Sequence, residues 1–215
     1  MSTLLEGKTL NPAYQAAGTP KEISLSELGG VMNSPLDPAL YAMARAGKIF
    51  FATHTVATAV APLQVVPTTT AAFVVNNVDT STSGKLVVPI MAGVFLGSGT
   101  AGIGTTLFAQ VGSTALATQL AADTSGVTRG NTRGGLDASI AFVGLSKTVA
   151  GSWLPIASVD NAAAAVPGTG IQVPLHGMFV VRPTFAFGLH AVAGAGTSAA
   201  FVFSAAWLEI QGTTP

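Results

Sequence analysis

The sequence predicts an all-β fold, an antiparallel β-sandwich of the jelly-roll type, preceded by an N-terminal arm that contains a short helix. From Lys48 onward, runs rich in Val, Ile, Phe and Thr recur at short spacing between clusters of Gly, Pro, Asn and Ser. This is the pattern of short strands joined by turns. Many strands without interleaved helices favour a sandwich or jelly roll. A chain of 215 residues is long enough to close one such core.

The first 47 residues differ from the rest, and we predict an arm at 1–47 and the β-sandwich domain at 48–215. The arm holds both tyrosines and a large share of the charged residues. Asp37 is suited to cap a helix, Pro38 to occupy its first position, and Gly47 to end it in the left-handed conformation. The arm therefore predicts a helix of about two to three turns just before the first strand.

The β region divides into short apolar runs, and the last of them shows the clearest alternation. In that run one set of side chains points one way and the other set points the opposite way, and neither set is polar. We expect one face of this strand to meet the core and the other to be covered by a neighbour. The sets are Phe201, Phe203, Ala205, Trp207 and Glu209 on one side, and Val202, Ser204, Ala206, Leu208 and Ile210 on the other. The predicted strands are 49–56, 72–78, 85–90, 94–96, 106–111, 139–145, 171–173, 177–181, 186–192 and 199–210.

The connections between these strands are predicted from glycine content. Glycine-rich segments at 97–99 and 194–196 predict hairpin turns. The stretch 123–137 contains four glycines and has no periodicity, so we predict an exposed loop there. Glu209 is a carboxylate in an otherwise apolar strand, and such a group requires a partner. We expect a basic residue of the same sheet or of an adjacent subunit.

The charge content of the chain is unusually low. Charged residues make up 8% of it, against about 25% in ordinary soluble domains. The net charge is zero, so no electrostatic repulsion keeps copies apart. Such a surface suits a protein whose faces are covered by partners, although abundant neutral polar residues are an alternative way to solvate it. Without clusters among its nine basic and nine acidic residues, the chain lacks the basic face that direct nucleic-acid binding needs.

Targeting and redox signals are also missing from the sequence. The most apolar run, 86–96, is too short for a membrane-spanning helix and contains Pro89 and Gly93. The N-terminus has no basic region followed by an apolar run, so we expect no signal peptide. Because the chain has no cysteine, disulfides, thiolate metal sites and cysteine nucleophiles are excluded.

One string matches the glycine pattern of dinucleotide-binding folds. Gly97-Ser98-Gly99-Thr100-Ala101-Gly102 follows an apolar run, as the G-x-G-x-x-G pattern does. In those folds a helix begins directly after the glycines and offers free amides to the phosphates. Here the continuation at 103–108 is β-branched and aromatic. A hairpin loop explains these glycines better, and we predict no cofactor.

Histidines and carboxylates offer no pattern typical of a catalytic or metal site. His54, His176 and His190 lie far apart, without the close pairs that seed a zinc site. A hydrolytic triad depends on geometry rather than spacing, but no G-x-S-x-G string is present. The acidic candidates for glycoside hydrolysis mostly lie among turn residues. They are Asp79, Asp123, Asp137, Asp160 and Glu209. We predict no enzyme, with no catalytic, cofactor-binding or metal-binding residues. A metal on an oligomer axis, held by one histidine per copy, stays open.

Two segments resemble virion structural proteins of tailed bacteriophages. The first is Val74-Val75-Asn76-Asn77 followed by Ser83-Gly84-Lys85-Leu86-Val87-Val88 and then by Gly93-Val94-Phe95-Leu96-Gly97-Ser98-Gly99-Thr100. The second is the stretch from Val181 through His190 to Trp207-Leu208-Glu209-Ile210, expected to form a C-terminal hairpin. The resemblance covers roughly half of the chain. It implies a jelly-roll protein of the phage head, commonly a trimeric cement or decoration subunit, and it brings no catalytic residues.

Composition and resemblance together lead to one functional expectation. We expect a capsid cement or decoration subunit that assembles as a homotrimer, binds the major capsid protein or other virion proteins, and stabilises the head shell. Its expected location is the virion, assembled in the host cytoplasm, without contact to nucleic acid or membrane. One alternative is a major coat, vertex or tail subunit. A second is a carbohydrate-binding or hydrolytic β-sandwich, for which the tryptophans and tyrosines are few.

Overall fold

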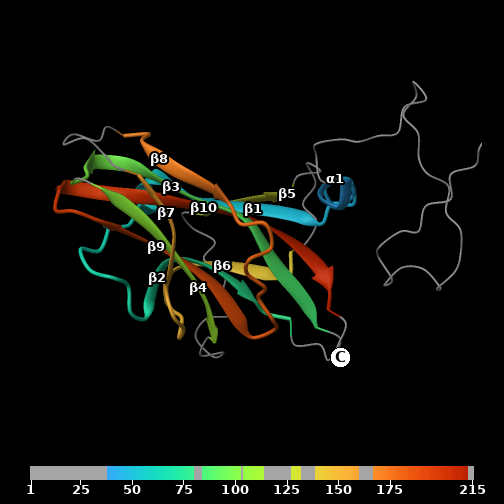
Figure 1. Ribbon diagram of the computed structural model, residues 1–215. Coiled ribbons are helices and arrows are strands. Elements are labelled where there is room, and N and C mark those ends of the chain that lie inside the picture. Colours follow the sequence, from blue (N-terminus) through green and yellow to red (C-terminus); the bar gives the residue numbers. More distant parts are fainter. Residues whose placement is uncertain are drawn as a thin grey trace, which may run out of the picture. The chain divides into compact units, whose positions relative to one another are not determined.

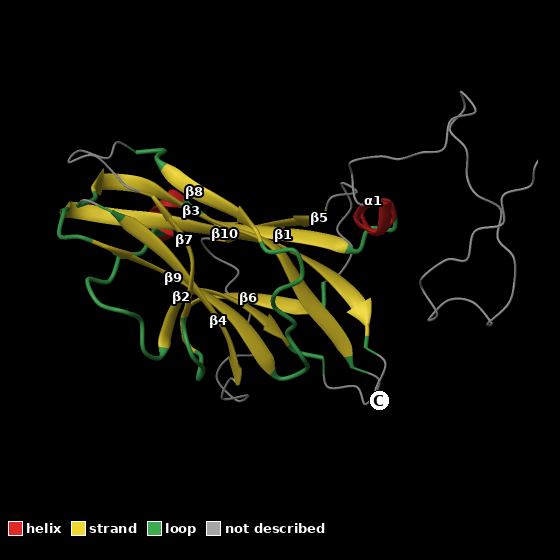
Figure 2. Cartoon of the chain, viewed as in Figure 1, coloured by secondary structure: helices red, strands yellow, loops and turns green. Residues whose placement is uncertain are grey.

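The computed structural model is nearly all antiparallel β-structure over the residues that it describes, which are 38–79, 84–102, 104–113, 127–131, 139–159 and 167–212 (Figures 1 and 2). The chain divides into two units, Met1–Tyr41 and Ala42–Pro215, and the β-sandwich lies in the second. The described elements are α1 (Pro38–Arg45), β1 (Ile49–His54), the 3₁₀ helix η2 (Val56–Thr58), β2 (Thr70–Asn77), β3 (Lys85–Thr100), β4 (Thr105–Ser113), β5 (Val127–Asn131), β6 (Ala141–Thr148), β7 (Leu154–Val159), β8 (Gly170–Pro174), β9 (Phe185–Ala193) and β10 (Thr197–Gln211).

Two five-stranded sheets pack face to face, which confirms the predicted β-sandwich. The first sheet has the order β5-β1-β10-β3-β8 and the second has the order β6-β2-β9-β4-β7. Eight of the strands form four antiparallel pairs, which are β1 with β10, β2 with β9, β3 with β8 and β4 with β7. From one pair to the next, the first strand comes later in the sequence and the second strand comes earlier. Successive pairs alternate between the sheets, so the chain follows the wound double strand of a jelly roll.

Strands β5 and β6 come from the tip of this wound double strand, between β4 and β7. Each of them adds to an edge of a different sheet, β5 beside β1 and β6 beside β2. The insertion therefore widens both sheets on the same side of the sandwich. Both pairings are antiparallel, like those of the eight other strands.

Helix α1 ends as the sequence predicts. Pro38 is its first residue, and Gly47 has a φ of 68°. The Gly47 amide donates to Ala44 O at 3.0 Å and the Lys48 amide donates to Met43 O at 2.9 Å. These two bonds form the Schellman pattern that terminates helices at a left-handed glycine. The prediction of an arm over 1–47 otherwise concerns 1–37, which lie outside the described residues.

The predicted strands 85–90 and 94–96 are one long strand, β3, that runs through Pro89 and Gly93. Proline is tolerated because the register with β10 shifts between Ala206 and Trp207, opposite Pro89, and such irregularities accommodate a missing N–H. The predicted strand 177–181 is wrong. Its only described ladder contact is the bridge between Val87 and Val181.

Two strands were not predicted from the sequence. The stretch 123–137, predicted as an exposed loop, contains β5, which owes its extended form to pairing with β1 rather than to periodicity. Strand β7 begins Leu154-Pro155, and its register with β4 shifts between Leu107 and Phe108. Proline at an irregular edge strand obscures the strand signal in sequence. The sequence also predicts a loop or a short helical turn at 162–167, and most of this stretch lies outside the described residues.

The two glycine-rich connections are not hairpins, contrary to the sequence prediction. Residues 97–99, predicted as a turn, belong to β3 itself. The segment after β3 leads to β4 in the other sheet, and the segment after β9 leads to β10 in the other sheet. The same topology overturns the expected C-terminal hairpin. Gly99 and Gly104 both have a φ of 74°, which favours glycine. A side chain at Gly196 would collide with Thr100 O, so glycine lets the two crossings lie against each other.

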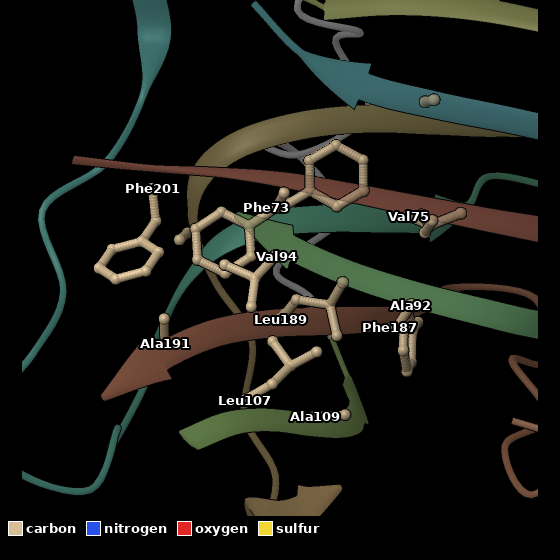
Figure 3. Close-up of a cluster of buried hydrophobic side chains, with 14 of the residues drawn as sticks. Phe73, Val75, Ala92, Val94, Leu107, Ala109, Phe187, Leu189, Ala191 and Phe201 are labelled. Atoms are coloured by element: carbon tan, nitrogen blue, oxygen red, sulfur yellow. The ribbon is translucent and has the colours of Figure 1, made fainter. Parts of the chain in front are cut away.

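The core fills the space between the sheets with aliphatic and aromatic side chains (Figure 3). The alternation predicted for the last strand is confirmed, because its first set packs in this core while Val202 and its companions face away. Burying one such large side chain contributes about 1.5–3 kcal/mol. The largest fully buried core side chains include Phe73 from β2, Leu107 from β4, Phe187 and Leu189 from β9, and Phe203 and Trp207 from β10.

The outer face of the second sheet is covered by the chain itself. Val149 and Trp153, from the connection between β6 and β7, pack on Val74 and its neighbours in a separate cluster. Gln110 donates through Nε2 to Val149 O at 3.0 Å, and Trp153 donates through Nε1 to Thr68 O at 3.0 Å. This connection is therefore a roof for the second sheet.

The close contact between the roof and β4 yields a testable prediction. A Cβ at Gly112 would collide with the main chain of Ala150, whereas a Cβ at Gly177 would meet nothing within 4 Å. We expect Gly112→Ala to lower the free energy of unfolding by about 2–3 kcal/mol because the roof must move. In Gly177→Ala the only expected strain comes from the positive φ of 74° at this position, and the free energy of unfolding should fall by about 1 kcal/mol. Urea unfolding of both variants measures the difference, and equal losses would contradict it.

Candidate interaction surface

The outer face of the first sheet carries apolar side chains without a described roof over its centre. We define it as the outward-facing residues of β1, β3, β8 and β10, among which Phe51 is 40% exposed. Met91, Phe95 and Leu208 on the same face are half-buried. Toward one end the face is covered, where Val60 pairs with Phe201 and the neighbouring Val202 is fully buried.

Glycines make the centre of this outer face flat. A Cβ at Gly93 would stand 2.7 Å from Ser204 Oγ, and one at Gly130 would stand 2.5 Å from the tip of the Phe51 ring. The Phe51 ring therefore lies over β5, where any larger residue than glycine would lift it. Gln172 donates through Nε2 to Met91 Sδ at 3.0 Å, which holds both side chains along the sheet.

The outer face holds no ionisable side chain at the outward positions of β1, β3, β8 and β10. At about 3.3 Å per residue and 4.8 Å between strands, these four strands present roughly 600 Å². One partner in a standard protein interface contributes about 800 Å². The face is thus large enough to form most of a specific interface, and its chemistry suits an apolar partner surface.

Sequence analysis identified only part of this face. The alternation of the last strand placed Val202, Ser204, Ala206, Leu208 and Ile210 together, and that grouping is confirmed. Phe51, the most exposed large residue of the face, was not recognised. Its signal is the pattern Phe50-Phe51-Ala52, in which the flanking residues are buried in the core and Phe51 is not.

Glu209 is buried and has partners of a kind that the sequence analysis did not expect. Its Oε1 accepts hydrogen bonds from Ser139 Oγ at 2.5 Å, from the Ile140 amide at 3.0 Å and from Trp207 Nε1 at 3.4 Å. These donors are neutral, and two of them lie just before β6. A basic partner, on the same sheet or on an adjacent subunit, stays a prediction. Because β6 belongs to the second sheet and β10 to the first, Glu209 ties the sheets together.

The Asn-Asn and Ser-Gly-Lys motifs of the resemblance have a structural role. Asn77 is fully buried and donates through Nδ2 to Lys85 O at 2.7 Å and to Val181 O at 2.9 Å. The Lys85 amide donates to Asp79 Oδ2 at 2.6 Å. These bonds hold the end of β2, the start of β3 and the segment before β9 at one point. Asp79 is thus accounted for as a turn residue.

Two of the three histidines are buried, and they lie on different sheets. His54 ends β1 and His190 lies in β9, with exposed fractions of 3% and 4%. Burial lowers the pKa of His54 to about 4, and a backbone interaction with Thr58 opposes this shift. Burial also lowers the pKa of His190, opposed by its contact with Ala191 O. Both rings are therefore neutral at pH 7, and His176 lies apart from them as an exposed residue of a turn.

The remaining candidates do not converge on a reactive site. No three His, Asp or Glu side chains form a metal-binding group within the described residues. Asp123, Asp137 and Asp160 lie outside those residues. The guanidinium of Arg182 stands 4.6 Å from the centre of the Phe185 ring, a cation–π contact that orients the turn before β9.

Comparison with protein-family models, with curated proteins and with solved structures finds no match. Among the residues described, neither helix has the length or the apolar character to span a bilayer. A sandwich fold hosts many functions, so the functional argument depends on the surface chemistry of this chain.

The hydrogen bonds of Glu209 give a second prediction. Removing the hydroxyl in Ser139→Ala leaves the buried carboxylate with one donor fewer, which should lower the free energy of unfolding by about 1–3 kcal/mol. Ser158→Ala, at an exposed position of β7, is the matched control and should change it by less than about 0.5 kcal/mol. Urea denaturation followed by tryptophan fluorescence measures both. A loss no greater than that of the control would mean that Ser139 does not stabilise Glu209.

Proposed function

We propose that this chain is a virion structural protein, a cement or decoration subunit that assembles with copies of itself and stabilises a phage head shell. The observation that carries the proposal is the uncharged, apolar outer face of the first sheet in a chain of which only 8% is charged. A face of this kind gains free energy when it leaves water, at about 25 cal/mol for each Å² of apolar surface.

The partners follow from the same chemistry. Without ionisable side chains, the outer face offers nothing to phosphate groups, which argues against nucleic acid as its ligand. An apolar protein surface is the matching partner, either a second copy of this chain or the major capsid protein of the shell. The net charge of zero removes the repulsion that would oppose association between copies.

The resemblance to tailed-phage virion proteins supports the same proposal. Its motifs include Leu86-Val87-Val88 and Trp207-Leu208-Glu209-Ile210, which lie side by side in β3 and β10. Each of these segments contributes both to the core and to the outer face. The homotrimer, the binding to a capsid lattice and the location in the virion are what the resemblance implies, and they form part of the proposal.

The native mass of the purified chain, measured by light scattering at several concentrations, tests the self-assembly. We expect a trimer for the unmodified chain. Phe51→Glu places a charge on the outer face and should weaken the association at least tenfold, because the interface would then bury an unpaired carboxylate. Gln172→Lys adds a charge at an exposed side chain of the same face and tests the face without disturbing the core.

The matched control is Ser158→Glu, which adds a charge to β7 of the other sheet and should leave the native mass unchanged. Circular dichroism establishes that each variant keeps its β-structure. An unmodified chain that stays monomeric at high concentration would overturn self-assembly. A trimer insensitive to both Phe51→Glu and Gln172→Lys would place the contact between copies elsewhere.

A further inference from the structure

The connection between β1 and β2 is tied to both sheets of the sandwich. We call residues 55–69 the strap, which can be followed between those strands in Figure 1. Near its middle, the Val60 amide donates to Phe201 O of the first sheet at 2.9 Å. Three residues later the Leu63 amide donates to Ala191 O of the second sheet at 3.0 Å. The strap therefore closes one end of the gap between the sheets.

A buried histidine stands at the start of the strap. His54 immediately precedes it, with its ring centre 5.3 Å from that of Phe73 and 5.6 Å from that of Phe203. Neither ring nitrogen of His54 has a partner in good hydrogen-bond geometry, although the backbone of Thr58 lies close enough to oppose the lowering of its pKa. A buried polar group without partners costs free energy, and a phenylalanine would fill the same aromatic surroundings without that cost. A histidine ring in this position is therefore less favourable than a phenylalanine ring, and its protonation at low pH increases the cost in free energy.

The second buried histidine stands where the strap reaches the second sheet. His190 Nδ1 lies 3.0 Å from Ala191 O, the oxygen that also accepts the Leu63 amide of the strap. Its ring is 6.5 Å from that of Trp153, whose Nε1 donates to Thr68 O near the end of the strap. Both histidines are thus placed at anchor points of one segment.

The described elements around these rings bring no carboxylate that is free to stabilise a protonated histidine. Strand β2 contains no ionisable residue, and β9 contains only His190. On β10 the only ionisable side chain is Glu209, which is already bound to Ser139. Strand β4 and the roof at 149–153 contain none, while β5 places Arg129 in register with Ala52, two residues before His54.

We propose that the strap is an acid-sensitive latch, which closes the sandwich while His54 and His190 are neutral and detaches when they take up protons. A charged imidazolium in these surroundings would have only a backbone contact, at Thr58 or Ala191, to offset its lost hydration. Lifting the strap would let water reach the rings, because the strap begins directly after His54 and is anchored at Ala191 O, which His190 also contacts. The strap already exposes Val56, Val65 and Val66 to solvent, so its detachment adds to an apolar surface at this end.

The direction of the pH dependence follows from the protonation states. In the unfolded chain a histidine titrates near pH 6.5, whereas the burial of both rings shifts the folded-state pKa values below that. The folded state therefore binds fewer protons than the unfolded state. The stabilisation that depends on neutral histidines is complete above about pH 6.5 and is lost as the pH falls toward 4. The latch is closed at neutral pH and opens on acidification.

Amide hydrogen exchange at pH 7.5 and pH 5, corrected for intrinsic rates, tests the latch in the full chain. We expect the protection factors of Val60 and Leu63 to fall at least tenfold more than those of the β3–β10 ladder. In the variant His54→Phe with His190→Phe the difference should vanish. The matched control His176→Asn removes an exposed histidine whose φ is 46°, a conformation that asparagine tolerates, and it should behave as the unmodified chain.

A titration of the His54 ring by NMR separates the latch from a general loss of stability. A folded-state titration of His54 near pH 6.5 would overturn the proposal, as would equal losses of protection in the strap and the ladder. If the double variant does not fold, the single variant His54→Phe replaces it, and strap opening at pH 5 equal to that of the unmodified chain would then be the contradicting result. None of these outcomes depends on whether the chain is a virion protein.

Discussion

The structure depends on the position of β10 in the middle of the first sheet. This strand pairs with β1 on one side and with β3 on the other, so neither of its edges is free. Its inner face supplies Phe203 and Trp207 to the core and Glu209 to the contact with β6. Its outer face supplies the centre of the proposed interface. The core, the link between the sheets and the binding surface therefore share one strand.

The fold class could be predicted from sequence because the strands that make the core have strong apolar periodicity. Strands β2, β9 and β10 were anticipated nearly in full, and so was the end of α1 at Gly47. Strands β5 and β7 were not, since pairing to a neighbour decides the conformation of a short segment such as Leu154-Pro155. The predicted hairpins were wrong for a related reason. Glycine indicates a turn, but it does not determine which sheet the next strand joins.

The candidate site was predicted less completely than the fold. Low charge indicated a covered surface, but only the sheet order separates the face roofed by Trp153 from the face that exposes Phe51. The partner of Glu209 could not be foreseen either. A carboxylate can be satisfied by amides and hydroxyls as well as by a cation, and the donors before β6 are brought to it by the packing of one sheet on the other. Buried histidines are equally invisible, since burial is a property of the tertiary structure.

The winding order of the strands also bears on how the chain acquires its structure. Ile49 pairs with Leu208, so the central position of the first sheet stays empty until β10 has been synthesised. During synthesis, β1 and β3 emerge with the strand that belongs between them still unmade, and their edges and apolar faces are open to other chains. Pairing across such a large sequence separation also makes folding slow. Until residues 197–211 leave the ribosome, the edges of β1 and β3 that belong against β10 therefore stay open to pairing with another chain.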